Sequence, residues 1–270
     1  MPVTARTRAG LARTAGHTPV RFPDTASGDC RVSAEVDVTG LGLHDISTTA
    51  TEDARPIVLL GASYLAAWPL AQVSGCPVVN RGVPGDQTHE YLDRFERDVV
   101  ALQPRAVVIW GIDNDVIRAP RGRTAEACWC VERNLEALVR LARVHGIEPI
   151  LVTDLTLRPP ARWFEWLAAI AGRIRGKESY QQRINGHVLR LNDFIRALAQ
   201  RTGTRVLDLH PLVSTRKGMR ARRYAQADGS HLTDAGYRVI DAYAVPRLEA
   251  WIAAPPPVHA DAPLVRVAGG

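Results

Sequence analysis

The sequence of 270 residues has few cysteines, few aromatic residues and no long apolar run. Its four cysteines are too few and too scattered for the disulfide framework of a small secreted domain. They are Cys30, Cys76, Cys128 and Cys130. We therefore expect buried free thiols. No stretch approaches the roughly 18 consecutive apolar residues of a membrane-spanning helix, so no transmembrane segment is expected.

Other absences narrow the choice of partners. The net charge is +6, but no block of Lys and Arg is interleaved with aromatic residues, so a nucleic-acid partner is not expected. No histidine pair has metal-ligand spacing, and the turn "NRGVPGD" (80–86) lacks the Gly-Lys-Ser/Thr of a phosphate loop. The sequence therefore predicts neither a metal site nor a cofactor, and it carries no signal for the oligomeric state.

The composition changes along the chain and predicts three parts. Residues 1–53 lack sustained periodicity and are expected to form a largely irregular extension with one possible added strand. Residues 254–270 are Pro-rich and are expected to form a tail, which leaves one domain over residues 54–253. The N-terminus has no apolar core of a secretory signal, so a cytoplasmic location is expected, although its Arg-, Thr- and Ala-rich start also fits an organelle-targeting peptide.

Within the central domain, short β-branched apolar runs alternate with helical patterns. Five runs are apolar throughout, which is typical of strands covered on both faces: 56–60, 77–80, 106–110, 149–153 and 205–209. Helices are predicted from an N-cap at Thr88 to about residue 102, over 124–145, over 185–201, and from Thr233 until Pro246 kinks or ends the last one. This alternation predicts a three-layer α/β/α fold with a five-stranded, mainly parallel sheet.

Chemically useful side chains follow the predicted strands. Ser63 follows the first strand, "NRGVPGD" the second and "GIDND" (111–115) the third, while "DGSH" (228–231) precedes the last helix. In parallel sheets reactive groups gather beyond the carboxyl ends of the strands. The four clusters are therefore expected to share one rim.

Four blocks in this order resemble the SGNH (GDSL-type) hydrolase family. They are "LLGAS", "VVNRGVPGDQTHEYLDRF", "VVIWGIDNDVIR" and "DGSHLTDAGY", and the resemblance covers residues 56–252. It implies a flavodoxin-like SGNH fold and a cofactor-free esterase that acts on a small-molecule carboxylic ester or thioester. It assigns the nucleophile to Ser63, the base to His231 and its orienting partner to Asp228. It assigns the oxyanion donors to Ser63, Gly85 and Asn114.

Two positions depart from the family pattern. The first block usually reads Gly-Asp-Ser, whereas this chain has Ala62. The third usually reads Gly-x-Asn-Asp, and here one more residue stands between Gly111 and Asn114. We align on Asn114 because an ionised Asp113 would repel an oxyanion, and we expect this loop to bulge.

The chemistry supports these roles. A serine hydroxyl is a poor nucleophile until a base accepts its proton. Histidine suits that role because its ordinary pKa is near 6.5, and an aspartate three residues before it can fix the tautomer of the ring. Glycine at position 85 permits close approach of the backbone or a positive φ.

The segment 158–185 is long for a connection and carries an apolar stripe that includes Trp163 and Trp166. Three interpretations stay open: a helix packed on the domain, a lid over an acyl pocket whose aromatic residues bind substrate, and a surface that meets lipid or a partner. Three alternative functions also stay open. They are a carbohydrate O-deacetylase of the same fold, a catalytically weak binding module, and a domain that holds a nucleotide on "NRGVPGD".

Overall fold

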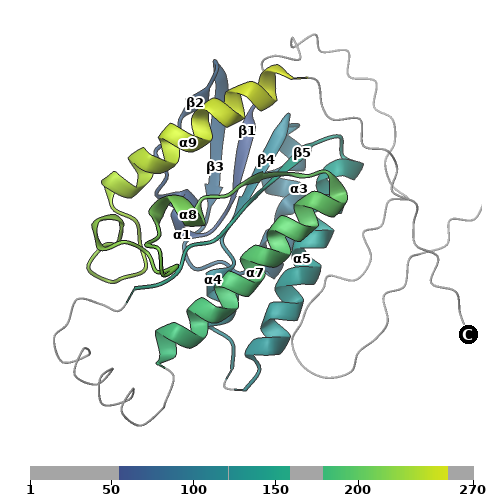
Figure 1. Ribbon diagram of the computed structural model, residues 1–270. Coiled ribbons are helices and arrows are strands. Elements are labelled where there is room, and N and C mark those ends of the chain that lie inside the picture. The colour runs from purple at the N-terminus through teal and green to yellow at the C-terminus, as the bar shows by residue number, and fades with distance from the viewer. Residues whose placement is uncertain (1–54, 121, 159–178, 255–270) are drawn as a thin grey trace, which may run out of the picture.

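A computed structural model of the chain describes residues 55–120, 122–158 and 179–254. At its centre lies a six-stranded sheet in the order β2-β3-β1-β4-β5-β6 (Figure 1). The strands are β1 (Ile57–Gly61), β2 (Gln72–Val73), β3 (Cys76–Gly82), β4 (Ala106–Trp110), β5 (Glu148–Val152) and β6 (Arg205–Leu207). The predicted three-layer, mainly parallel architecture is confirmed.

The sheet has one strand more than predicted. β2 pairs antiparallel with β3 at its edge, and all other pairings are parallel. β2 has only two residues, and the turn at Ser74 and Gly75 that joins it to β3 has positive φ at both positions. So short a strand has no apolar periodicity that the sequence could reveal.

Helices cover both faces of the sheet (Figure 1). They are α1 (Ser63–Ala66), α2 (Thr88–Asp93), α3 (Phe95–Asp98), α4 (Asp113–Ile117), α5 (Thr124–Val144), α7 (Tyr180–Thr202), α8 (His210–Val213) and α9 (Asp234–Ala253), with 3₁₀ turns at Val100–Leu102 and Arg222–Tyr224. Apolar residues of α2, α5 and α7 pack on one face. Those of α1, α8 and α9 pack on the other.

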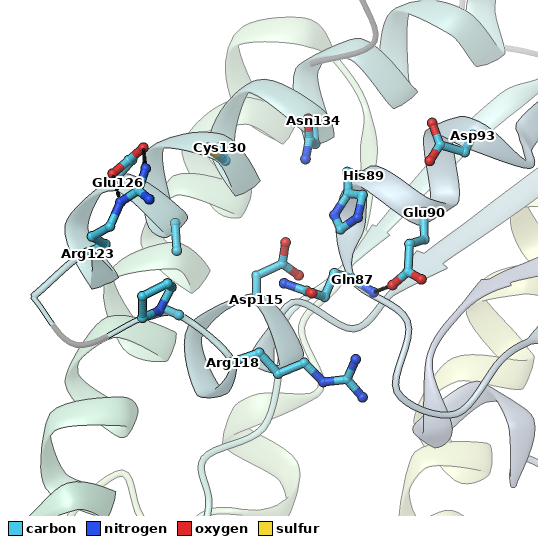
Figure 2. Close-up of a pocket in the computed structure, with 13 residues that line it drawn as sticks. Gln87, His89, Glu90, Asp93, Asp115, Arg118, Arg123, Glu126, Cys130 and Asn134 are labelled. Carbon is cyan, nitrogen blue, oxygen red and sulfur yellow. Dashed lines mark hydrogen bonds and ion pairs between the residues drawn. The ribbon is translucent and has the colours of Figure 1, made fainter. Parts of the chain in front are cut away.

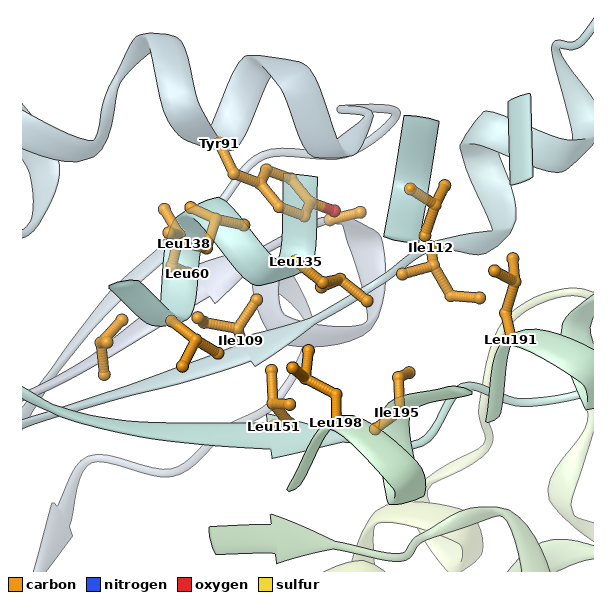
Figure 3. Close-up of a cluster of buried hydrophobic side chains, with 14 of the residues drawn as sticks. Leu60, Tyr91, Ile109, Ile112, Leu135, Leu138, Leu151, Leu191, Ile195 and Leu198 are labelled. Atoms are coloured by element: carbon orange, nitrogen blue, oxygen red, sulfur yellow. The ribbon is translucent and has the colours of Figure 1, made fainter. Parts of the chain in front are cut away.

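The strands alternate their side chains between these two cores. Val58 and Leu60 belong to the core beneath α5 and α7 (Figure 3). Ile57 and Leu59 belong to the core beneath α9. Every residue of β1 is buried, as is every residue of β4, which confirms the expectation of cover on both faces for these two strands. The expectation is wrong for β3, in which only Cys76 is buried.

Three of the four predicted helices correspond to α5, α7 and α9, whereas the segment predicted as one helix from Thr88 to residue 102 is divided into α2, α3 and a 3₁₀ turn. α7 begins earlier than predicted because the Ser179 side chain caps it in a box with Gln182. The prediction that Thr88 is an N-cap is wrong. Gln87 occupies the N-cap position, and Thr88 is buried inside the first turn. Pro246 lies inside α9, which continues to Ala253, so of the two predicted effects of this proline, a kink or an end, the end is wrong.

The cysteine prediction holds for only part of the set. Cys76 and Cys128 are buried thiols outside any disulfide, whereas Cys130 is disulfide-bonded, so the prediction is wrong at that position. In the described ranges no helix is both long and apolar enough to cross a membrane.

Gly61→Ala should destabilise the fold strongly. A Cβ at Gly61 would lie 1.9 Å from Trp110 O and 2.8 Å from Leu65 Cδ1, and the carbonyl belongs to the paired strand and cannot move away. We expect the free energy of unfolding, measured with urea, to fall by about 3 kcal/mol or more.

Gly186→Ala is the matched control. Gly186 is exposed inside α7, and a Cβ there meets no atom within 4 Å. Its free energy of unfolding should rise by about 0.5–1 kcal/mol, since alanine favours a helix over glycine. Equal effects of the two substitutions would contradict the packing account.

Candidate active site

Three of the four sequence blocks leave the sheet at one level. Gly61 at the end of β1 pairs in register with Gly82 of β3 and with Trp110 of β4. All three strands are parallel, so the segments that follow them start side by side at the same rim. Ser63, the 83–87 loop and the 111–115 segment are therefore brought together, as the sequence predicted.

Ser63 is the first residue of α1 and is half-buried. The N-cap position belongs to Ala62, so the Ser63 side chain does not cap the helix. Ala62 is buried and its N–H donates to Trp110 O at 3.3 Å, which fixes the turn against β4. A hydroxyl that the local structure does not use is available for chemistry.

The buried Arg94 clamps the first two blocks together. Its guanidinium donates to the carbonyls of Gly61 at 3.1 Å and Arg81 at 2.8 Å, and its Nε pairs with Asp86 at 2.9 Å. Burial raises the pKa of Asp86, although the Arg94 cation acts to lower it. Arg94 lies within the second sequence block, but the pattern of charges around it is ordinary and its role was not predicted.

Gly85 and Asn114 meet at the same rim. Gly85 has φ +90°, a conformation that favours glycine. The Asn114 side chain donates through Nδ2 to the carbonyl of the next residue, Asp86, at 3.0 Å. An amide nitrogen carries two hydrogens, so one donor of Asn114 stays available to a ligand.

The extra residue in the third block is accommodated at the start of α4. Gly111 has φ +120°, and α4 then begins at Asp113. Asp113 is buried beside Asp154, whose Oδ2 accepts the N–H groups of Ile112 at 2.6 Å and Asp113 at 2.9 Å. These donors act to lower the pKa of Asp154, but burial outweighs them and raises it. Burial and that neighbouring carboxylate raise the pKa of Asp113 to about 8.

Asp228 and His231 form a hydrogen-bonded pair. His231 Nδ1 lies 2.6 Å from Asp228 Oδ2, while Asp228 Oδ1 accepts the N–H groups of Ser230 at 2.8 Å and His231 at 3.0 Å. Burial acts to raise the pKa of Asp228, but the bonds from His231 and Ser230 outweigh it and lower that pKa. A carboxylate only accepts, so Nδ1 carries the proton and Nε2 is left as a base.

This pair is tied to the nucleophile turn through neighbouring residues. Tyr64, next to Ser63, donates its hydroxyl to the carbonyl of Ser230, next to His231, at 2.9 Å. Within the described ranges no hydrogen bond joins Ser63 Oγ to the His231 ring. The structure thus brings the first and fourth blocks together through Tyr64 and Ser230.

The remaining predicted residues have simpler outcomes. Trp163 and Trp166 lie outside the described residues. His210 is buried at the start of α8, its ring nitrogen lies 3.1 Å from Gly218 O, and burial lowers its pKa. Among the residues that the structure describes, no group of three or more His, Cys, Asp and Glu side chains could hold a metal ion.

The sequence was compared with known families and the fold with solved structures. The model of the GDSL-like lipase/acylhydrolase family matches residues 58–239. The chain belongs to this family. No curated protein matches the chain in sequence.

Solved structures of family members share the fold. A putative acylhydrolase from Bacteroides fragilis is 24% identical with a TM-score of 0.56, over 73% of this chain and 88% of its own. A lipase/acylhydrolase from Enterococcus faecalis is 21% identical with a TM-score of 0.54, over 73% and 96%. An acetylxylan esterase from Geobacillus stearothermophilus, solved as a catalytic mutant, is 17% identical with a TM-score of 0.53, over 70% and 92%. These structures show the shared fold, and membership of the GDSL-like lipase/acylhydrolase family makes the chain an esterase-type hydrolase.

A polar cavity of about 540 Å³ adjoins the rim of this GDSL-type domain between α2, α4 and α5 (Figure 2). Its lining is rich in charged and amide side chains: Gln87, His89, Glu90, Asp93, Asp115, Arg118, Arg123, Glu126 and Asn134. Neither Ser63 nor His231 lines it. Arg118 connects it to the site, because a Cβ placed at Gly85 would lie 2.6 Å from the Arg118 guanidinium.

Asp113→Asn should change how the stability of the domain depends on pH. Asp113 keeps its proton in the folded state to about pH 8, whereas the unfolded chain loses it near its ordinary pKa of 3.8. The folded state therefore binds more protons between these values, and the Asp113 contribution to the free energy of unfolding falls as the pH rises. The wild-type value minus the variant value, from urea unfolding, should fall between about pH 5 and about pH 8.

Asp193→Asn, which removes an exposed carboxylate from α7, is the control for the loss of a charge. A wild-type-minus-Asp113→Asn difference that stays constant over this pH range would contradict the assignment of a buried proton to Asp113.

Proposed function

We propose that the chain hydrolyses carboxylic esters or thioesters through an acyl-enzyme on Ser63. The observation that carries this proposal is the Asp228–His231 pair, 2.6 Å apart, in a loop hydrogen-bonded to the residue after Ser63. Membership of the GDSL-like lipase/acylhydrolase family supports the reaction class.

In the proposed reaction Ser63 Oγ attacks the carbonyl carbon of the ester, and His231 Nε2 accepts its proton. Asp228 holds Nδ1 and stabilises the imidazolium that forms. The tetrahedral intermediate collapses, and the alcohol or thiol leaves with the proton of His231. Water then attacks the acyl-enzyme by the same route and releases the acid and free Ser63.

The negative oxygen of the intermediate needs hydrogen-bond donors. The backbone N–H groups of Ser63 and Gly85 and the free amide hydrogen of Asn114 are the proposed donors. Asp86 O holds Asn114 Nδ2, and Asp154 holds the backbone at the start of α4, so the Asn114 amide is fixed before substrate arrives. A donor held in this way is worth about 3 to 4 kcal/mol of barrier.

Ser63→Ala should abolish both ester hydrolysis and covalent labelling by a fluorophosphonate. The substitution removes only the attacking oxygen, so kcat for 4-nitrophenyl acetate should fall at least about 10³-fold. The measurement is intact-protein mass spectrometry after labelling, with steady-state rates on the same samples.

Ser74→Gly is the matched control, because Ser74 lies in the exposed β2–β3 turn at φ +47°, which glycine accepts. It should be labelled at the wild-type rate. A wild-type protein that is not labelled at Ser63 would favour the catalytically weak binding module instead.

The polar cavity favours a second candidate, a carbohydrate O-deacetylase. Ligand pockets are usually lined mainly by apolar side chains, whereas this one offers donors and acceptors of both charges, which suits a polyhydroxyl substrate. The acetylxylan esterase among the structural neighbours fits this interpretation. An acetylated sugar would place its acetyl group at Ser63 and its rings in the cavity past Arg118.

Arg118→Ala should raise KM for an acetylated xylo-oligosaccharide more than KM for 4-nitrophenyl acetate, because only the sugar reaches the cavity. We expect about a tenfold difference, the value of one lost polar contact. Arg238→Ala, on the exposed side of α9, is the control for the loss of an arginine. Equal changes for both substrates would remove the support for a sugar substrate.

A further inference from the structure

Behind the Asp228–His231 pair lies a closed ring of hydrogen bonds around Arg220. Arg220 is fully buried, and its NH1 donates to Ser230 O while its NH2 donates to the Tyr64 hydroxyl at 2.6 Å. The Tyr64 hydroxyl donates in turn to Ser230 O at 2.9 Å. Both lone pairs of this carbonyl are therefore occupied, one by the guanidinium and one by the phenol.

The ring fixes the direction of each bond. Burial raises the pKa of Tyr64 well above its ordinary value, although the Arg220 cation acts to lower it, so the phenol keeps its proton. That single proton is given to Ser230 O, which leaves the phenol oxygen to accept from Arg220. The backbone carbonyl of Tyr64 also accepts from the Tyr237 hydroxyl at 2.8 Å, which holds Tyr64 from the α9 side.

A buried guanidinium is costly without opposite charge nearby. The Asp113–Asp154 pair lies close enough for the Arg220 cation to lower the pKa of both carboxyls against the larger effect of burial. The Arg220 cation thus acts to lower the pKa of Asp154, although burial has the larger effect and raises it. Beneath the site, Arg220 is thus buried together with the carboxyl groups of Asp113 and Asp154.

The loop that carries the catalytic pair needs such support because its own side chains are exposed. The Asp228 and His231 side chains are 47% and 43% exposed, so neither is packed in place. The loop is held instead through its backbone: Arg158 N donates to Gly229 O at 2.9 Å, and Arg220 and Tyr64 hold Ser230 O. The direction of the His231 ring toward Ser63 then depends on these anchors.

We propose that Arg220 is a positioning residue that fixes His231 against Ser63. The two terminal nitrogens of its guanidinium, the fork, bind the residue before His231 and the residue after Ser63. This inference rests on the proposed function. Arg220 touches neither substrate nor a reacting atom. It acts through the Ser230 carbonyl and the Tyr64 hydroxyl, so its loss should misplace the base without removing substrate contacts.

The test measures kcat, KM and the rate of fluorophosphonate labelling for Arg220→Met, Arg220→Lys, Tyr64→Phe and the Tyr64→Phe/Arg220→Lys double variant. Arg220→Met should lower kcat and the labelling rate about 100-fold, the usual effect of a misplaced catalytic group, with KM unchanged within about twofold. Tyr64→Phe, which keeps one of the two donors to Ser230 O, should lower kcat about tenfold. Arg220→Lys keeps the charge but not the fork, and should stay well below the wild type.

The double variant distinguishes positioning from general loss of stability. If Arg220 and Tyr64 act through one ring, their effects on kcat are less than multiplicative. Arg143→Met is the matched control, because Arg143 NH2 also bridges two acceptors, Thr202 O at 2.7 Å and Thr204 Oγ1 at 2.8 Å, between α5 and the start of β6. It should lower the melting temperature and leave kcat and labelling unchanged.

The outcomes separate the two proposals. A wild type that is labelled at Ser63, with Arg220→Met and Tyr64→Phe variants that fold and react at the wild-type rate, overturns the role of Arg220 alone. A wild-type kcat in Arg220→Lys would show that the charge is sufficient and that the two guanidinium nitrogens are not required. A wild type that is not labelled overturns the proposed function and the positioning role together. If Arg220→Met does not fold, kcat and the labelling rate of Tyr64→Phe and of the double variant still test the positioning role.

Discussion

The register of three parallel strands is the constraint on which the rest of the structure depends. Gly61, Gly82 and Trp110 end at one level, so the segments that follow them start within reach of one another. The close approach of Gly61 to the Trp110 carbonyl keeps this register, because no other residue type fits there. A shift of one residue would reverse every side chain of β1 and separate Ser63 from its partners.

Two buried arginines stabilise the rim by holding backbone carbonyls. The Arg94 guanidinium donates hydrogen bonds to the carbonyls of Gly61 and Arg81, and that of Arg220 donates to the carbonyl of Ser230. A buried carbonyl without a donor is costly, and Gly61 O accepts from Arg94 in addition to the N–H of Val83. A guanidinium, with several donors in a fixed plane, satisfies carbonyls from different segments at once and so fixes their separation. In this domain Arg94 and Arg220 therefore fix the spacing between the segments whose carbonyls they bind.

The sequence predicted what depends on local pattern and missed what depends on tertiary contacts. The apolar runs, Gly203 after α7 and the ordered blocks around Ser63 and His231 are local signals, and each gave a strand, a helix end or a candidate residue. Arg220 lies in an Arg-rich stretch that resembles a solvated surface, and its burial comes from Tyr64, 156 residues earlier. The strand β2 was missed for a related reason, since two residues carry no pattern.

The exposure of the Asp228–His231 pair bears on the fate of the acyl group in the proposed reaction. The Asp228 and His231 side chains are 47% and 43% exposed, so bulk water reaches this pair directly. An acyl-enzyme on Ser63 would be attacked mainly by water, which is far more concentrated than any competing alcohol. Such a site favours hydrolysis over transfer of the acyl group to a second substrate.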